Sequence, residues 1–447
     1  MRPWLTWSVA IVVYLLAVFH RTSLGVAGLQ AGERFGAGPA ALSAFTMLQV
    51  GVYALMQVPT GLLVDRFGPR RMLTCAALLL GAGQLLFAVA TVYPLALVAR
   101  GVLGVGDAMT FVSVIRMVAA IFSARRYPLV VALSATLGAV GNLAATVPLT
   151  LLLHQVGWTA TFAVAGAATA GYALVAATRL PRGVFTAPAG VHAETVGELP
   201  AEAPAAAAPI EPAEPGGVRR ALAAAWAEPG TRLGYWVHFT ATFSPAVLGL
   251  LWGYPNLVEA QGLSAAAASS VLALLVVVLM VAGPVIGAVI GHRPAARMPM
   301  TGGYLVAALL TGTVLAVWPG GHPPVVVLAR AFGVLAVGGA LTTAAFAFVR
   351  DANPLHRVGT ATGLVNVGGF LAITLCAPGI GLLLDLLDGV LAVSTAYRIA
   401  FTVPAALLLV GTWRCVVWHR RGGSSPPVAG ATRVDGTRVD LTRPAAA

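Results

Sequence analysis

Long apolar runs dominate the sequence, and short polar stretches separate them. A helix needs about 20 apolar residues to cross the hydrocarbon core of a bilayer, which is about 30 Å thick. Lipid offers no partner to an open strand edge, and the runs are too long for barrel strands, so each run predicts a membrane-spanning helix. The twelve predicted spans are 4–28, 42–63, 72–93, 95–119, 128–153, 158–178, 233–257, 264–291, 300–318, 323–349, 359–386 and 396–418.

Two polar stretches are much longer than the others. Residues 183–218 are mainly Ala, Pro and Glu without a basic residue, a composition that predicts a disordered linker. Residues 219–228 predict a short helix lying on the membrane surface. The predicted domains are an N-terminal six-helix bundle (1–180), a cytoplasmic linker with the short surface helix (181–232), a C-terminal six-helix bundle (233–420) and a disordered cytoplasmic tail (421–447).

Three short segments of the first half recur in the second half at nearly one offset. The matched positions are Gly61 and Gly287, Arg100 and Arg330, and Asn142 and Asn366, which lie 226, 230 and 224 residues apart. The sequence therefore predicts an all-α integral membrane protein, with twelve transmembrane helices in two pseudo-symmetric six-helix bundles. Internal repeats with a binding site at their junction are typical of secondary transporters.

The composition agrees with a membrane protein, because 58% of the residues are apolar, 9% are charged and the mean hydropathy is +0.88. The formal net charge of +12 lies in short loops and the tail, with no basic stripe among aromatic residues, which excludes a nucleic-acid partner. The three cysteines lie far apart and match no metal or disulfide spacing. We expect no metal and no cofactor.

The arginines set the predicted orientation. Alternate loops carry most of them, whereas the opposite loops hold little beyond Arg34, with Arg398 at a helix start. The positive-inside rule predicts a multi-pass protein of the plasma membrane with both termini in the cytoplasm. Residues 1–19 begin like a signal peptide but lack an A-x-A-like cleavage site, so we expect them to be retained as a span. The arginines on the predicted cytoplasmic side are Arg66, Arg70, Arg71, Arg125, Arg126, Arg293, Arg297, Arg350 and Arg357.

The loop after the second span concentrates charge. Asp65 ends a predicted helix among arginines, so its carboxylate can hold two helix ends together and release them, as a conformational latch would. The alternative is a plain topology signal. The second copy of the loop has Gly291 where Asp65 stands in the first, which predicts a stronger latch in the N-terminal half. The predicted latch residues are Gly61, Asp65, Arg66, Gly68, Arg70 and Arg71.

A few charges lie inside the predicted spans, where each is costly unless it is paired or hydrated. Arg21 and Arg100 fall at similar depth, and arginine forks suit a carboxylate or phosphate, so both are predicted to bind substrate. Asp107 shares a helix face with Arg100 and lies near the midplane, where it could carry a coupling proton. The alternative is that Arg100 and Asp107 simply neutralise each other. Arg116 falls on the opposite face, which favours a structural role as a partner of Asp65.

Two motifs resemble signatures of the major facilitator superfamily. They are G-x-x-x-D-R-x-G-x-R-R, which starts at Gly61, and R-x-x-x-G-x-G, which starts at Arg100. With twelve predicted spans, a long central loop and the duplication, the resemblance covers nearly the whole chain. It implies two bundles that rock around a central cavity and open it to each side in turn.

Within that superfamily, residues 20–27 and 100–116 resemble the organic-anion/proton symporters. In those proteins the first span carries an Asp–Arg pair and the fourth span carries an acid at the position of Asp107. Arg21 and Asp107 match this pattern, whereas His20 stands in place of the aspartate. His20 is therefore either a second proton-coupling residue, since histidine titrates near neutral pH, or inert.

The second half offers fewer polar candidates. A run of aromatic rings lies between residues 235 and 243 in the seventh span, and we predict that Trp236 and His238 contact the substrate. Core packing is the alternative. Asn366 in the eleventh span is a third candidate, although its small neighbours equally predict close helix packing.

Sequence motifs also limit the function. The chain has no G-x-x-x-x-G-K-[ST] motif for an ATP-driven pump, and no H-E-x-x-H or G-x-S-x-G motif for an enzyme. The first hypothesis is a monomeric secondary transporter in the lipid bilayer that takes up a small organic anion with protons. A drug/proton antiporter is the alternative, although the fifth span lacks the G-P-x-x-G-G motif usual in drug antiporters. A receptor-like protein that transports nothing is a third hypothesis.

Overall fold

The computed structural model describes residues 3–37, 39–145, 147–182 and 217–422, and regular structure in these ranges is entirely helical. The first helices are α1 (Pro3–Phe35), α2 (Pro39–Phe67), α3 (Pro69–Val89), α4 (Tyr93–Ile121), α5 (Tyr127–Ala144) and α6 (Val147–Arg179). They are followed by α7 (Gly217–Ala227), α8 (Pro229–Val247), α9 (Gly253–Pro255), α10 (Ala265–His292), α11 (Arg297–Val317), α12 (Val325–Ala352), α13 (Val358–Leu387), α14 (Val393–Ala400) and α15 (Thr402–Gly422). Short turns of other helix types are η1 (Leu248–Trp252), η2 (Asn256–Ala260), η3 (Pro294–Ala296), η4 (Pro319–Gly321) and η5 (Leu355–Arg357).

Nine of the helices in the described ranges are long and apolar enough to cross a membrane. Such helices suit lipid because each backbone N–H and C=O is satisfied within its own helix. The predicted surface helix corresponds to α7. Most of the predicted linker and almost all of the predicted tail lie outside the described residues, so their expected disorder stays a prediction.

Three predicted spans are wrong in detail. The predicted span 128–153 is divided, because α5 ends at Ala144 and α6 begins at Val147. Pro148 explains this break, since proline starts helices readily but disfavours helical geometry in the residue before it. The predicted separation of this span from the span 158–178 is matched by a kink inside α6 at Gly157, whose φ is 76°. The seventh span passes through two π-helical turns, η1 and η2, close to Pro245 and Pro255, which lack the N–H that a regular helix needs. The last span bends at Phe401, between α14 and α15.

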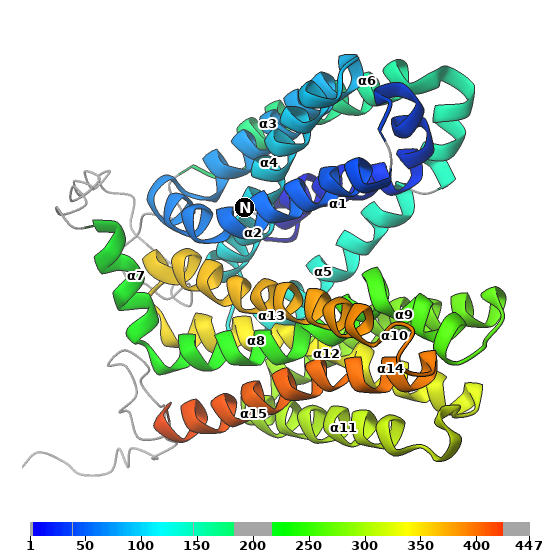
Figure 1. Cartoon of the computed structure of the whole chain (residues 1–447). Helices are drawn as coiled ribbons and strands as arrows, with labels where there is room; N and C mark the ends of the chain where they lie inside the picture. Colours follow the sequence, from blue (N-terminus) through cyan, green and yellow to red (C-terminus); the bar gives the residue numbers. More distant parts are fainter. Residues whose placement is uncertain (1–2, 38, 146, 183–216, 423–447) are drawn as a thin grey trace, which may run out of the picture.

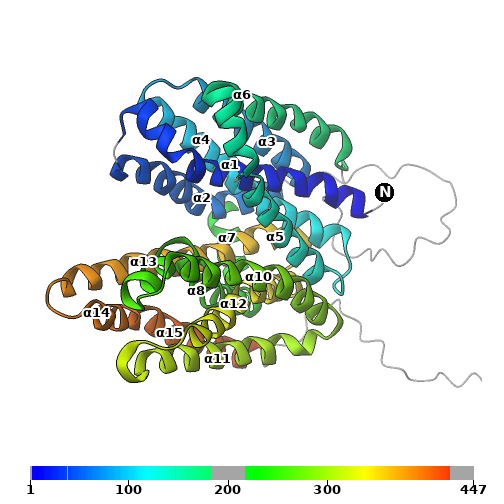
Figure 2. The same cartoon turned by 90° about the vertical axis from the view of Figure 1, so that its right-hand side faces the viewer.

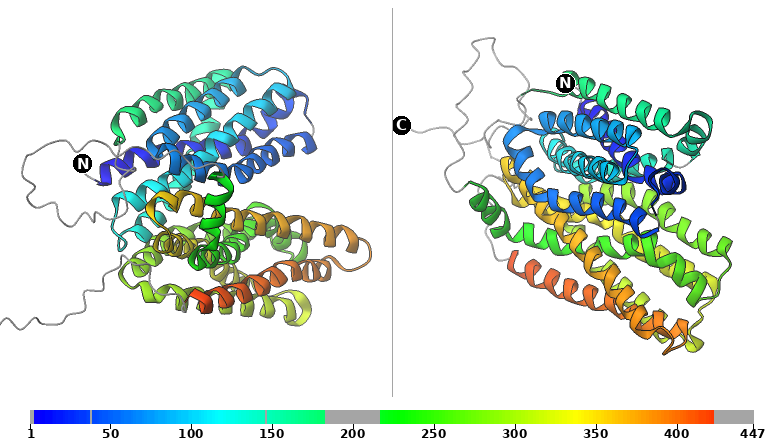
Figure 3. Two further views of the ribbon diagram at one scale, coloured as in Figure 1. Left: turned by 90° about the vertical axis from the view of Figure 1, so that its left-hand side faces the viewer. Right: turned by 45° about the horizontal axis from the view of Figure 1, so that its top comes forward.

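The helices form two groups. The first group contains α1–α6, in which α3 packs on α4 and α6, and α2 packs on α4. The second group contains α8–α15, in which α8 packs on α12, α13 and α15. Figure 1 shows the first group above the second, and the further views in Figure 2 and Figure 3 show the same separation.

Small residues let the helices of the first group approach closely. Gly104 and Gly106, from the motif that starts at Arg100, lie on two sides of α4. A Cβ on Gly104 would lie 2.9 Å from the carbonyl oxygen of Gln49 in α2, and one on Gly106 would lie 2.9 Å from the backbone nitrogen of Leu80 in α3. The two glycines therefore seat α4 between its neighbours, as small residues do in membrane helix interfaces.

Two helix pairs make the largest contacts between the groups, and α4 with α13 and α5 with α12 make smaller ones. Helix α2 packs on α13, and α5 packs on α10. Their contacts concentrate at one end of the molecule, which is made of the C-terminal ends of α2, α4, α10 and α12 and the N-terminal ends of α5 and α13. We call this end the tied end. In Figure 1 the groups lie close together towards α7 and diverge on the other side.

Candidate functional site

The centre of the site is an ion pair between α1 and α4. Arg21 donates through Nε to Asp107 Oδ2 and through Nη2 to Oδ1, each at 2.7 Å. The Asp107 side chain is fully buried, whereas the Arg21 side chain is 28% exposed. The Arg21 guanidinium also lies over the ring of Tyr53 from α2, 4.6 Å from its centroid. The bidentate bond to Asp107 and the face of the Tyr53 ring therefore fix the position of the Arg21 guanidinium, which stays partly exposed.

The second group reaches the same level of the molecule through α13. The ring of Tyr53 lies 4.9 Å from the ring of Phe370. One helical turn before Phe370, towards the tied end, Asn366 donates through Nδ2 to Gln57 Oε1 at 2.6 Å. Both amide side chains are buried. Asn366 therefore holds the two groups together, next to the ion pair rather than in it.

Arg100 lies at the depth of Arg21, as predicted, but its side chain contacts backbone rather than the ion pair. Its side chain is fully buried and donates through Nη1 and Nη2 to the backbone oxygens of His20 and Arg21, each at 3.3 Å. Its guanidinium also lies 5.5 Å from the centroid of the Phe87 ring in α3. Asp107 instead pairs with Arg21. Arg100 thus fastens α1 to α4 inside the first group, and the geometry does not favour its predicted contact with substrate or a pair with Asp107.

His20 also points into the first group. Its Nε2 lies 2.8 Å from Thr169 Oγ1 of α6, and its side chain is fully buried. Neighbouring positions on a helix point in different directions, so His20 faces α6 while Arg21 faces α4. This position favours the inert alternative for His20.

The two ring candidates of α8 differ in position. The Trp236 ring lies 5.1 Å from the guanidinium of Arg414 in α15, inside the second group. His238 is buried, and its ring lies 5.1 Å from Phe346 of α12. Phe346 in turn lies 5.6 Å from Phe111 of α4. His238 thus packs against Phe346, the ring that contacts Phe111 of the first group, whereas Trp236 packs on Arg414 within the second group.

Asp65 joins the groups at the tied end. Its carboxylate accepts hydrogen bonds from the backbone N–H of Gly359 at 2.9 Å and of Thr360 at 2.6 Å, and from the Thr360 hydroxyl at 2.8 Å. These donors form the first turn of α13, where a negative charge is favourable. The contact expected between Asp65 and Arg116 is also present, with Nε 3.0 Å from Oδ1. One carboxylate therefore links α2, α4 and α13.

The other predicted latch residues have different neighbours, and Gly61 contacts the second group. A Cβ on Gly61 would lie 2.6 Å from the carbonyl oxygen of Gly359, so this glycine also faces α13. Gly68 has a φ of 80°, which favours glycine in the turn between α2 and α3. Arg70 donates to the backbone oxygen of Ala177 in α6, within the first group. Arg66 and Arg71 are exposed.

The second contact at the tied end uses different chemistry. Arg350 of α12 donates through Nη2 to the backbone oxygen of Phe122 at 3.0 Å, and its guanidinium lies 5.2 Å from the ring centroid of Tyr127. Gly291 of α10 packs so closely on the backbone oxygen of Arg125 that a Cβ would collide with it. Here a cation from α12, placed at the end of α4, and a glycine of α10, packed on the residue Arg125 before α5, take the place of the carboxylate contact.

The family model that describes the Major Facilitator Superfamily matches residues 10–308 of the sequence. The chain belongs to this superfamily. It is therefore a multi-pass membrane protein and a secondary transporter rather than an enzyme. No curated protein matches the sequence.

Solved structures of this superfamily share the fold. A single-substitution variant of the E. coli fucose:proton symporter FucP matches with a TM-score of 0.62 and 14% identity, over 91% of this chain and 98% of that chain. FucP in the outward conformation matches with the same TM-score and coverage at 15% identity. At this identity the likeness concerns the fold alone.

Sequence reasoning missed three members of this arrangement: Tyr53, Gln57 and Arg350. Gln57 carried a usable signal, because an uncharged polar residue within an apolar span needs a partner. Tyr53 and Arg350 carried none that separates them from other interface and loop residues. Within the described ranges, no group of three or more His, Cys, Asp and Glu side chains is placed to hold a metal.

Proposed function

We propose that this transporter takes up a small organic anion together with protons, by alternating access between two six-helix bundles. The observation that carries the proposal is the ion pair of Arg21, which is partly open, with Asp107, which is fully buried. Arg21 offers a permanent positive charge, and a guanidinium matches the planar geometry of a carboxylate. The fold it shares with a fucose:proton symporter supports proton coupling.

The ion pair suggests how proton and anion are coupled. While Asp107 is charged it occupies the guanidinium of Arg21 through both oxygens. Protonation of Asp107 removes that charge and leaves the Arg21 cation inside the membrane without a counter-charge, which is costly until an anion binds. An anionic substrate restores neutrality by taking the place of the carboxylate beside Arg21. Proton and anion then bind together, which is the requirement for symport.

We further propose that the tied end faces the cytoplasm and that the chain is a monomer in the plasma membrane. The loop arginines on that side follow the positive-inside rule. In this state the cytoplasmic side is closed by the contacts of Asp65 and Arg350, so the site is reached from outside. The bundles correspond to residues 1–180 and 233–420, joined by the cytoplasmic linker 181–232, with both termini and the tail 421–447 in the cytoplasm.

The latch role proposed for the Asp65 loop follows from the same arrangement. Asp65 is part of the first bundle, and its donors Gly359 and Thr360 are part of the second. These bonds must break when the cytoplasmic side opens. Gly61 lets α2 and α13 close tightly, whereas Arg66 and Arg71 are free to act as topology charges.

The thermal stability of the purified full-length protein tests the substrate class. We expect small carboxylates to raise the melting temperature and lipophilic cations to leave it unchanged. The variant Arg21→Gln should lose the response, because the fixed cation is gone. Arg34→Gln is the matched control, since Arg34 lies on the same helix but donates to the backbone of Ala90. Stabilisation by lipophilic cations alone would replace this proposal with drug/proton antiport.

A further inference from the structure

The second group contains a cavity of about 420 Å³ that is separate from the ion pair. Every lining residue belongs to the stretch from Phe243 to Leu409, and helices α8, α11, α12, α13 and α15 form its walls. Ligand pockets usually have volumes of about 300–1,000 Å³. The cavity is therefore large enough for a ligand of its own, and nothing in the proposed transport cycle uses it.

The cavity opens sideways, between α11 and α15. Its exposed lining residues on α11 include Gly312 and Thr313, and those on α15 include Ala405 and Leu409. Its inner wall is buried and apolar, with Phe243 of α8 among its members. Because both helices present this opening to the surroundings of the bundle, it faces the acyl chains of the bilayer.

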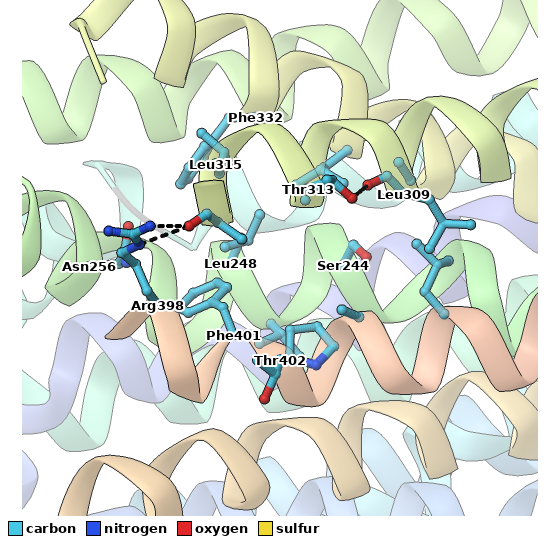
Figure 4. A pocket seen from close by; sticks show the side chains of 18 of the residues that line it. Ser244, Leu248, Asn256, Leu309, Thr313, Leu315, Phe332, Arg398, Phe401 and Thr402 are labelled. Carbon is cyan, nitrogen blue, oxygen red and sulfur yellow. Dashed lines mark hydrogen bonds between the residues drawn. The ribbon is translucent and has the colours of Figure 1, made fainter. Parts of the chain in front are cut away.

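One end of the cavity carries a positive charge. Figure 4 shows Arg398 and Asn256 together at that end, with Leu309 and Ser244 towards the other end. Arg398 donates through Nε, at 2.9 Å, and through Nη2 to the backbone oxygen of Ala316, which fixes the guanidinium at the rim. This rim lies opposite the tied end, where the outer head groups of the membrane would be.

We propose that this cavity binds a single-chain fatty carboxylate from the bilayer, with its chain between α11 and α15 and its carboxylate at Arg398. The apolar walls match the chain, and the cation at one end matches the head group. The lateral opening gives a single chain a path from the membrane. A ligand that carries charge at one end and is apolar along its length therefore fits better than a compact polar solute.

Binding of radiolabelled palmitate to the purified, delipidated full-length protein tests the proposal. We expect saturable binding, with hexadecanol competing much more weakly because it lacks the charge. Arg398→Gln should weaken palmitate binding by at least about tenfold, the scale of one charge-assisted contact, and Arg398→Lys should keep most of it. Equal binding of palmitate and hexadecanol by the wild type would overturn the assignment of Arg398.

Filling the cavity gives an independent test. Gly312 lies on the wall with open space beyond it, and Gly303 on the same helix also has open space but does not line the cavity. Gly312→Phe should abolish palmitate binding, whereas Gly303→Phe should leave it unchanged. Arg21→Gln should also leave it unchanged, so a failed transport proposal would not affect this result. Loss of binding in Arg21→Gln, or full binding in Gly312→Phe, would place the fatty acid elsewhere and contradict the proposal.

Discussion

In the first group the side chains of Arg100 and Arg116 are buried, whereas the corresponding positions of the second group hold an exposed arginine and a phenylalanine. Arg330, 230 residues after Arg100, is exposed. At the same offset Phe346 corresponds to Arg116, and Val337 corresponds to Asp107. The repeat has therefore kept its helices but not its charges. At these corresponding positions the buried charges belong to the first group, whereas the second group has an exposed arginine, an apolar side chain and an aromatic ring.

The two contacts at the tied end repeat this difference. Between α2 and α13, the carboxylate of Asp65 meets N–H groups at the start of a helix. On the other side of the tied end, Gly291 of α10 packs on the backbone of Arg125, and Arg350 of α12 donates to a carbonyl oxygen at the end of α4. A negative charge suits the first position and a positive charge suits the second, because of the helix dipole. The two sides of the interface between the groups are thus closed by side chains of opposite charge, Asp65 on one side and Arg350 on the other.

The largest effect is expected from Gly291→Val. The added side chain would collide with the backbone of Arg125, which cannot move without displacing α5. The tied end should stay open and transport should be lost. Gly302→Val is the matched control, because Gly302 lies near the same end with open space beside it.

Spin labels at Ser123→Cys and His356→Cys would measure this opening, after the exposed native Cys75 is replaced by Ala. The two labels belong to different groups at the tied end. We expect a longer distance in Gly291→Val than in the parent. An unchanged distance with full transport would mean that the close packing of α10 on α5 is dispensable.

A large effect is also expected from Asp65→Asn. The amide keeps the size of the side chain but loses its negative charge. That charge accepts three hydrogen bonds from the start of α13 and pairs with Arg116 of α4. Hydrogen bonds to a charged group contribute about 1.5–3 kcal/mol, so the closed state should lose at least about tenfold in population. Transport should fall strongly while insertion and expression stay normal.

Asp351→Asn is the matched control for Asp65→Asn. Asp351 pairs with Arg297 and lies 3.9 Å from the guanidinium of Arg350, both within the second group; it is 45% exposed, and ion pairs this exposed contribute little. We expect little change in its transport rate. If both variants transported at the parent rate, the Asp65 loop would serve topology alone.

The smallest effect is expected from Arg350→Gln. A cation at the end of a helix contributes about 0.3–1 kcal/mol, which corresponds to about a two- to fivefold change in the closed population. The label pair described above should report this shift, and Arg350→Lys should recover part of it because the charge returns. A larger loss in Arg350→Gln than in Asp65→Asn would reverse the proposed ranking of the two contacts.

The sequence was sufficient for the helical class, for most helix positions and for the contact of Asp65 with Arg116. Apolar run length and helical periodicity determine these features locally. The breaks near Pro148 and Pro255 were missed because apolar residues continue across them. A hydropathy pattern alone does not register a lost backbone hydrogen bond.

The sequence was insufficient for the partners of buried polar side chains. Arg100 and Asp107 share a helix face, but the neighbour that covers each of them depends on how α1 packs across α4. Arg350 binds backbone oxygens, which every residue has, so no residue type marks its partners. Asn366 and Gln57 are 309 residues apart, and only the packing of α2 on α13 brings them together.

Transport in proteoliposomes by Asp107→Asn tests the central claim most directly. The amide cannot take up and release a proton, but it resembles the protonated acid and leaves Arg21 free for the anion. Accumulation against an imposed pH gradient should be abolished, whereas counterflow without a gradient should continue, and the parent protein should perform both. Accumulation by Asp107→Asn at the parent level would show that the proton is carried elsewhere, and would contradict the account.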